Sequence, residues 1–511
     1  MIVTISTAAL LGIDAYPIEL EVDLSRSGMP AFIMVGLAEG AVREAKERVF
    51  SALKNSGLRL PPSRITVNIA PADIRKEGTA YDLPLALGLL AGAEYIPQNK
   101  LADLYMAGEL SLSGELKPVP GVLPLALRAK AAGARGIIVP AANAREAAVV
   151  QGLDVFACQD LAQVVRFLLN KENIAPQHCD VASLWQERQA FWQDFSEVKG
   201  QERAKRAIEI ACAGGHNLLF IGPPGSGKTM LASRIPTVLP PLSFNEALEV
   251  TKIYSVAGKL PPDQPLVVTR PFRSPHHTIS DAGLIGGGQY PRPGELSLAH
   301  RGVLFLDELP EFKKHVLEVL RQPLEEGRVT ISRAAVSLDY PGDVMLVAAL
   351  NPCPCGYLGD AAHQCTCSPM QVQRYRSRLS GPLLDRIDLH VEVPAVPYRD
   401  LKQTKSHISS ATMQARIFAA REIQAQRYTG LHFQTNSDLS GKWLEHFCPL
   451  TEQEHAFLEG AVQRLGMSAR AFTRVLRIAR TIADLAADTT LTTKHLAEAI
   501  NYRSLDRQNP D

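Results

Sequence analysis

Gly222-Pro-Pro-Gly-Ser-Gly-Lys-Thr229 is the stretch that decides the fold of the surrounding chain. It fits the pattern G-x-x-x-x-G-K-S/T, the phosphate-binding P-loop. Residues 217–221 before it read Asn-Leu-Leu-Phe-Ile and predict a short buried strand, and the residues from Met230 onward predict a helix. A strand, a glycine-rich loop and a helix N-terminus in this order place backbone N–H groups where they can bind phosphate oxygens.

The expected ligand of this loop is ATP with Mg²⁺. Lys228 would contact the β- and γ-phosphates, and Thr229 would ligate the metal ion. Backbone contacts come from the whole loop, so the predicted nucleotide-binding residues are Gly222, Pro223, Pro224, Gly225, Ser226, Gly227, Lys228 and Thr229.

Length and composition set the wider frame. A chain of 511 residues predicts about three domains. Because 54 Lys and Arg face 53 Asp and Glu, any nucleic-acid surface must be local. The first residues lack the basic region of a signal peptide, and no apolar run is long enough to cross a bilayer. We therefore expect a cytoplasmic protein with no membrane partner.

Two later apolar runs end in polar side chains that could complete the nucleotide site. Residues 302–308 read Gly-Val-Leu-Phe-Leu-Asp-Glu, a Walker B strand with two carboxylates at its end. Asp307 would hold Mg²⁺, and Glu308 would be the general base for the attacking water. The next such run ends at Asn351, which could hold this water near the γ-phosphate. The alternative for Asn351 is a turn residue at a strand end.

The first ~170 residues predict a separate α+β domain of ordinary size. Residues 18–24 and 65–69 alternate with period two, as half-buried strands do, and a helical pattern lies between them. Residues 71–86 and 108–121 resemble the proteolytic domain of Lon. That resemblance places Ala80 where Lon has its nucleophilic serine and Leu123 where it has its lysine. Without a hydroxyl and an amine, this domain is expected to be a non-proteolytic scaffold.

The order of P-loop, Walker B and polar strand end resembles that of an AAA+ ATPase. Three more runs, at residues 270–278, 291–300 and 351–356, resemble the magnesium-chelatase-like AAA+ proteins of the ComM/YifB family. With the Lon-like domain, this resemblance covers the chain essentially end to end. It implies a homo-hexameric motor that acts on single-stranded and branched DNA. The implied task is branch migration during recombination in natural transformation, together with recombination proteins.

The resemblance also gives an expected layout: an α/β AAA+ core with a helical lid, preceded by an inactive Lon-like domain. Val198, just before the core, could pack on adenine, and a role in the core is the alternative. The expected boundaries are 1–172 for the Lon-like domain, 173–195 for a linker, 196–395 for the AAA+ core and 396–511 for the helical domain.

Two arginines are expected to serve the nucleotide site in a ring. Arg386 would stabilise the phosphoryl group bound by a neighbouring subunit. The alternative for Arg386 is a local ion pair with Asp385 or Asp388. Arg470 occupies the sensor-2 position of the AAA+ pattern, on a predicted helix of the C-terminal domain.

Four cysteines form two C-x-C pairs separated by a short loop. Four thiolates suit tetrahedral zinc, and a disulfide is disfavoured in the cytosol. The spacing departs from the usual zinc knuckle, so unligated thiols remain the alternative, and His363 could replace one ligand. The cluster consists of Cys353, Cys355, Cys365 and Cys367.

Two insertions could face DNA in a central pore. Residues 328–340 alternate on both sides of Arg333-Ala334, which predicts a β-hairpin. In the related MCM rings the hairpin tip carries a basic residue that contacts DNA phosphate, so Arg333 is the candidate; a solvent-exposed turn is the alternative. The second insertion is the glycine-rich run 284–288. For His276 and His277, packing or subunit contact is favoured over a metal site, because adjacent residues of an extended chain point apart.

Three functions compete at this point. The main hypothesis is an ATP-driven DNA motor, and the second is a chelatase-type remodeller of a protein partner. The third, an ATP-dependent protease, is disfavoured by Ala80 and Leu123. DNA-stimulated ATP hydrolysis would separate them.

Overall fold

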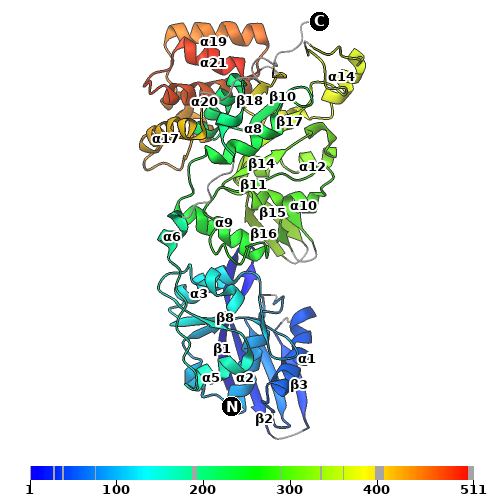
Figure 1. Cartoon of the computed structure of the whole chain (residues 1–511), viewed down its shortest axis with the longest axis vertical. Coiled ribbons are helices and arrows are strands. Elements are labelled where there is room, and N and C mark those ends of the chain that lie inside the picture. The colour runs from blue at the N-terminus through cyan, green and yellow to red at the C-terminus, as the bar shows by residue number, and fades with distance from the viewer. Residues whose placement is uncertain are drawn as a thin grey trace.

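The computed structural model describes residues 2–26, 29–36, 40–74, 76–186, 193–288, 291–333, 336–360, 362–396 and 408–503. Figure 1 shows three parts that follow one another along the long axis. The first domain is at the bottom, an α/β unit lies above it, and a helical unit is at the top. The chain therefore follows the order of the expected α+β, α/β and helical parts.

The first domain is built on a seven-stranded mixed sheet in the order β3-β4-β2-β1-β5-β8-β9. The β1–β2 and β2–β4 pairs are antiparallel, and the other pairs are parallel. The strands are β1 Ile2–Leu11, β2 Asp14–Ser25, β3 Ala31–Val35, β4 Arg64–Ala70, β5 Leu104–Met106, β8 Gly136–Pro140 and β9 Asp154–Cys158.

The two predicted alternating strands of this domain are confirmed as β2 and β4. β2 buries Ile18, Leu20, Val22 and Leu24, every second residue, as a sheet with one face on the core requires. The helix α2 is buried along its whole length, so it is the centre of this core. The helices are α1 Gly40–Asn55, α2 Asp82–Gly92, α3 Val122–Ala131, α4 Ala144–Ala147 and α5 Leu161–Leu168.

The second unit has a five-stranded parallel sheet in the order β11-β14-β17-β10-β18. Its inner strands are almost entirely buried, as expected when helices cover both faces of a parallel sheet. The elements are α7 Glu202–Gly214, β10 Leu218–Ile221, α8 Lys228–Arg234, α9 Phe244–Val256, β11 Phe272–Arg273, β14 Val303–Leu306, β17 Met345–Leu350 and β18 Leu389–Glu392.

Both predicted insertions lie in this unit, next to each other. The expected hairpin is confirmed as an antiparallel pair, with Arg333 opposite Val336. The glycine-rich insertion continues from α10 into a short strand, and a Cβ added at Gly286 would lie 2.9 Å from Ile331 of the hairpin. Residues 334–335 and the side chain of Arg333 lie outside the described part. The elements are α10 Asp281–Ile285, β12 Gly286–Gly287, β13 Arg292–Pro293, α11 Glu295–Leu298, α12 Lys314–Glu318, α13 Pro323–Glu326, β15 Arg328–Arg333 and β16 Val336–Pro341.

The C-terminal helices pack on the α/β unit through one shared core. That core joins α7 and the sheet to buried residues of α17 and α20, such as Ile417 and Ile478. No helix in the described ranges combines the length and apolar character needed to span a membrane. The remaining helices are α6 Val181–Gln186, α14 Pro369–Arg376, α15 Gly381–Leu384, α17 Ser410–Arg427, α18 Lys442–Phe447, α19 Glu452–Leu465, α20 Ala469–Leu485 and α21 Thr493–Asn501.

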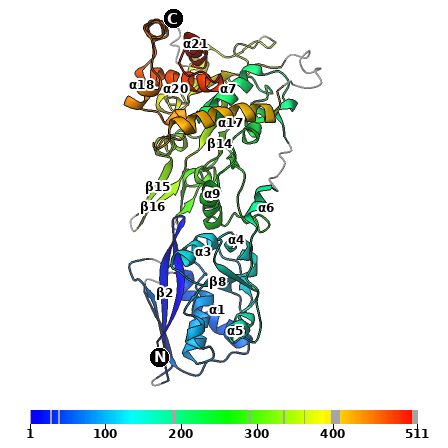
Figure 2. The same cartoon turned by 90° about the vertical axis from the view of Figure 1, so that its left-hand side faces the viewer.

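The first domain contacts the α/β unit at two places. Figures 1 and 2 both show the long β1–β2 hairpin reaching up to the region of β16, and Asp14 at its turn pairs with Lys252 of α9. Beside it, α3 packs on α9, and Leu123 shares one buried cluster with Val250. The position of the Lon lysine is therefore part of the core between the two units.

Candidate nucleotide site

The P-loop follows β10 and closes on the first residue of α8. Gly225 and Gly227 have φ values of 77° and 92°, in the left-handed region that glycine adopts without strain. The Lys228 ammonium donates hydrogen bonds to the carbonyl oxygens of Gly222 (2.7 Å) and Pro223 (2.9 Å). This lysine is therefore held at the carboxyl edge of the parallel sheet, where the sequence places the phosphates.

Asn351 reaches the same lysine from the neighbouring strand. β17 lies beside β10, and the Asn351 Oδ1 accepts a hydrogen bond from Lys228 Nζ at 3.1 Å. Burial lowers the pKa of Lys228, and the carboxylates of Asp307 and Glu308 act in the opposite direction. The structure therefore brings the predicted strand-end asparagine to the P-loop.

The two expected Mg²⁺ ligands also meet. Thr229 Oγ1 donates a hydrogen bond to Asp307 Oδ2 at 2.7 Å. A hydroxyl and a carboxylate are hard oxygen donors of the kind that Mg²⁺ takes together with phosphate oxygens and water. The pair fits the metal that the P-loop chemistry requires.

Glu308 has a contact that the sequence reasoning did not identify. Its carboxylate lies 3.4 Å from Nδ1 of His277, which follows β11 on the edge of the same sheet. His277 also stacks on His276 and meets the edge of Phe312. The backbone of Glu308 has φ 52°, a strained value for a non-glycine residue and one often found at functional sites. The sequence did offer one signal for this contact. His277 is a polar residue soon after β11, the strand that pairs with β14.

Val198 lies in the hydrophobic core. It is 3% exposed and belongs to the cluster that also holds Leu231 of α8. Packing therefore accounts for this residue, and a contact with adenine remains a prediction.

Arg386 lies at the amino ends of the parallel strands, whereas the P-loop lies at their carboxyl ends. Its carbonyl oxygen accepts a 2.8 Å hydrogen bond from Asn217, the residue just before β10, whereas the P-loop follows β10. Four strand residues span roughly 13 Å, so Arg386 is separated from the P-loop of its own chain by the depth of the sheet.

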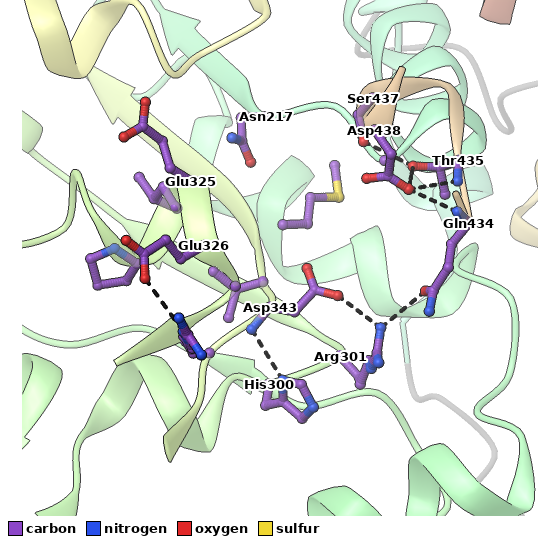
Figure 3. A pocket seen from close by; sticks show the side chains of 18 of the residues that line it. Asn217, His300, Arg301, Glu325, Glu326, Asp343, Gln434, Thr435, Ser437 and Asp438 are labelled. Atoms are coloured by element: carbon purple, nitrogen blue, oxygen red, sulfur yellow. Dashed lines mark hydrogen bonds and ion pairs between the residues drawn. The ribbon is translucent and has the colours of Figure 1, made fainter. Parts of the chain in front are cut away.

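Arg386 lines a pocket of about 1150 Å³ at the amino ends of the parallel strands. Figure 3 shows Asn217, Arg301, Glu325 and Asp343 around this pocket, on different elements of the α/β unit. The Arg301 guanidinium donates to Asp343 at 2.7 Å and to Gln434 at 3.0 Å, which ties the core to the helical unit.

Arg386 pairs with Glu325 rather than with the aspartates beside it in the sequence. Asp385 instead binds Arg470 at 3.1 Å. Burial lowers the pKa of Arg386, and the nearby cations Arg470 and Arg321 add to this. Within the described residues the Arg386 Nε has no hydrogen-bond partner. Arg386 and Arg470 therefore share one charged surface, on the side away from the P-loop.

The four clustered cysteines form a site of tetrahedral size. Their sulfur atoms lie within 4.8 Å of one another, and three pairs are separated by 3.3, 3.6 and 3.7 Å. Zinc–sulfur bonds of about 2.3 Å place sulfur atoms about 3.8 Å apart, whereas a disulfide needs about 2.0 Å. His363 instead faces Asp360, at 3.3 Å. The geometry fits a Cys₄ zinc site better than disulfides.

The pKa values of these thiols differ, because neighbouring sulfur atoms disfavour one another's charged form. Backbone hydrogen bonds from Tyr357 and Thr366 lower the pKa of Cys355 to about 5. A backbone hydrogen bond at Cys355 lowers the pKa of Cys367, but burial and the neighbouring sulfurs raise it to about 12. Four thiolates can therefore coexist here only when a cation offsets their repulsion.

Comparisons with known proteins identify the family of this chain. The profile for "Magnesium chelatase, subunit ChlI" matches residues 194–401, that for "Subunit ChlI of Mg-chelatase" matches 20–143, and that for the ChlI C-terminal region matches 407–503. Over a shorter stretch of 136 residues the chain is 31% identical to Lon protease 2 of Bacillus subtilis (strain 168), which covers 26% of this chain and 23% of that protein.

Several relatives match over nearly the full length. YifB of Escherichia coli (strain K12) is 46% identical over 505 residues, covering 98% of this chain and 97% of that protein. Competence protein ComM of Haemophilus influenzae (strain Rd) is 44% identical over the same length, with the same coverage. The chain therefore belongs to the ComM/YifB family of magnesium-chelatase-like AAA+ proteins.

Proposed function

We propose that this protein is an ATP-hydrolysing, hexameric motor that moves branched DNA during recombination. The observation that supports this proposal is where the expected site residues lie in the α/β unit. One face holds Lys228, Asp307 and Glu308, and the opposite face holds Arg386 and Arg470. A chain with complementary halves of one site on opposite faces is suited to a closed ring of identical subunits.

Hydrolysis at such an interface needs little covalent chemistry from the protein. Lys228 binds and orients the γ-phosphate, and Asn351 positions the attacking water. Glu308 accepts the proton of that water, and Arg386 of the next subunit stabilises the charge on the transferred group. Thr229 and Asp307 would hold Mg²⁺, which when bound would neutralise further phosphate charge.

DNA is the favoured partner for two reasons. One of the full-length relatives is named a competence protein, and the sequence resemblance described above implies work on DNA in natural transformation. The β15–β16 hairpin and the glycine-rich insertion lie side by side, so a ring could present both to one nucleic-acid strand. Because the chain as a whole is close to neutral, binding would rest on such local elements.

The first domain serves as a scaffold in this proposal and not as a protease. Ala80 and Leu123 offer neither a nucleophile nor a general base. Leu123 is fully buried, and its backbone N–H donates to the buried Glu146, which also accepts from Ser255 of α9. The contact between the first domain and the α/β unit thus buries the position of Leu123, which a proteolytic site would need to keep accessible.

A second component of the proposal is one structural zinc ion per chain, held by the four clustered cysteines. Metal analysis of protein purified under reducing conditions tests it directly. A protein that folds, binds nucleotide and contains no zinc would contradict this part alone.

The function is tested with labelled three- and four-way DNA junctions. We expect wild-type protein to hydrolyse ATP faster with DNA, to bind DNA with little sequence preference, and to displace strands from junctions only with ATP. Lys228→Ala is the matched control, because it removes the phosphate contact and should abolish displacement. ATP hydrolysis with neither DNA binding nor junction movement over a range of salt would favour a chelatase-type remodeller of a protein partner.

A further inference from the structure

The loop that carries the four cysteines begins and ends at the nucleotide site. Asn351, whose side chain accepts from Lys228, precedes Cys353 by two residues. After the last cysteine the chain enters α14, whose buried Tyr375 lies beside the backbone of Asn351. Both ends of the loop therefore meet at the same asparagine.

The loop also rests directly on the P-loop. A hydrogen bond from the Gly356 N–H to the Cys353 carbonyl oxygen (3.0 Å) closes a tight turn. A Cβ added at Gly356 would lie 2.5 Å from Cδ and 2.8 Å from Cγ of Pro224. Such separations are far below van der Waals contact, so the turn has no room for a larger residue against the P-loop.

The thiol groups connect these contacts within the loop. The N–H of Cys355 points at the sulfur of Cys367 (3.4 Å), so the two C-x-C pairs are held against each other. Cys353 is completely buried, whereas the other three cysteines are partly exposed. A metal ion bound to all four would fix the loop at both ends.

We propose that this four-cysteine loop braces the nucleotide site: with zinc bound, it fixes Asn351 beside Lys228 and supports the P-loop at Pro224. The proposal rests on the zinc site proposed above, and it gives that zinc a role in nucleotide binding rather than in contacting DNA. Loss of the metal loosens the loop and weakens the binding of ADP and ATP.

Two glycines of the loop provide a matched pair of variants. Gly356 and Gly359 have φ values of 89° and 79°, so alanine costs similar backbone strain at both. Only Gly356 faces Pro224, because a Cβ at Gly359 would have no atom within 4 Å. Neither substitution removes a thiol, so both variants should retain zinc.

The experiment measures zinc content and Mg²⁺–ADP affinity by calorimetry, without DNA. We expect Gly356→Ala to keep about one zinc ion per chain and to bind ADP at least about fivefold more weakly, the scale of forcing a methyl group into a packed contact. Gly359→Ala should match the wild type in both measurements. Wild-type protein stripped of zinc should bind ADP as weakly as Gly356→Ala and recover when zinc is restored.

The outcomes separate this proposal from those on which it rests. No zinc in the wild-type protein would overturn the zinc site and the brace together. Suppose that both variants contain zinc, and that Gly356→Ala, Gly359→Ala and the zinc-stripped protein all bind ADP as tightly as the zinc-loaded wild type. This result would overturn the brace alone. Neither result bears on DNA movement, because the measurements contain no DNA.

Discussion

Glu308 is the residue on which turnover depends in the proposed cycle. Replacing it with Gln keeps the size and removes the base, so Glu308→Gln should bind ATP normally and hydrolyse it roughly 10²- to 10⁴-fold more slowly. Single-turnover hydrolysis and nucleotide binding together check this. Glu311→Gln is a suitable control, because Glu311 sits on the same loop but pairs with Arg378 at 2.9 Å. Near-normal turnover in Glu308→Gln would remove this carboxylate from the role.

His277 is expected to restrain that carboxylate. Its Nδ1 lies 3.4 Å from a carboxylate oxygen of Glu308, so the imidazole can hold that oxygen away from the attacking water. His277→Ala should raise ATP hydrolysis in the absence of DNA by up to about fivefold, since exposed pairs of this kind are worth about 0.2–1 kcal/mol.

His276→Ala is the control for that variant, because the His276 ring contacts Thr278 at 2.9 Å instead of Glu308. The comparison is made by steady-state hydrolysis at saturating ATP. A fall in turnover for His277→Ala alone would mean that the imidazole positions Glu308 for catalysis rather than restraining it.

At the scale of single elements, the β15–β16 hairpin carries the expected DNA contact. Arg333→Ala should weaken DNA binding and reduce the steepness of its salt dependence by about 0.9 for each duplex phosphate that the side chain no longer neutralises. ATP hydrolysis without DNA should stay unchanged. Binding titrations over a series of salt concentrations check both points.

The hairpin provides its own control in Arg328, at the base of β15. Arg328 is paired with Glu326 at 3.4 Å and Asp339 at 3.8 Å. Arg328→Ala should therefore change the salt dependence less than Arg333→Ala. Equal effects would assign the binding to general positive charge and not to the tip.

Elements encoded by a contiguous pattern could be predicted from the sequence, and contacts between distant elements could not. The alternation in β2 and the 222–229 loop each carry their signal locally. By contrast, β3 lies at a sheet edge and reads Ala-Phe-Ile-Met-Val, so its sequence is apolar throughout and does not alternate, although only Phe32 and Met34 are partly buried. A strand of this kind is defined by its partner β4, which lies about thirty residues later in the chain.

The same distinction between local patterns and distant contacts applies to the candidate site. Lys228, Asp307 and Asn351 could be predicted because each follows a buried strand, and parallel strands bring their carboxyl ends together. The contact between His277 and Glu308 and the pairing of Arg386 with Glu325 could not. Each depends on the order of strands in the sheet or on side-chain packing, which spacing along the chain does not encode.

At the scale of the whole molecule, the arrangement of the two faces predicts how subunits share the site. Arg386 lies across the sheet from its own P-loop, so in the proposed ring each competent site would combine Lys228 from one subunit with Arg386 from the next. Arg386→Ala and Lys228→Ala should each be inactive when assembled alone. In a ring mixed from equal amounts of both, about a quarter of the interfaces should pair an intact Lys228 with an intact Arg386.

Mixing the two inactive proteins should therefore restore part of the ATP hydrolysis, measured after assembly with ATP at fixed total protein. A matched mixture of Lys228→Ala with the double variant Lys228→Ala/Arg386→Ala should restore none, because no subunit in it has an intact Lys228. If the first mixture stays as inactive as the second, although both assemble, Arg386 does not complete a neighbour's site. The exposed surface shared by Arg386 and Arg470 would then need another role, and the division of the site between two faces would no longer support a ring-shaped motor.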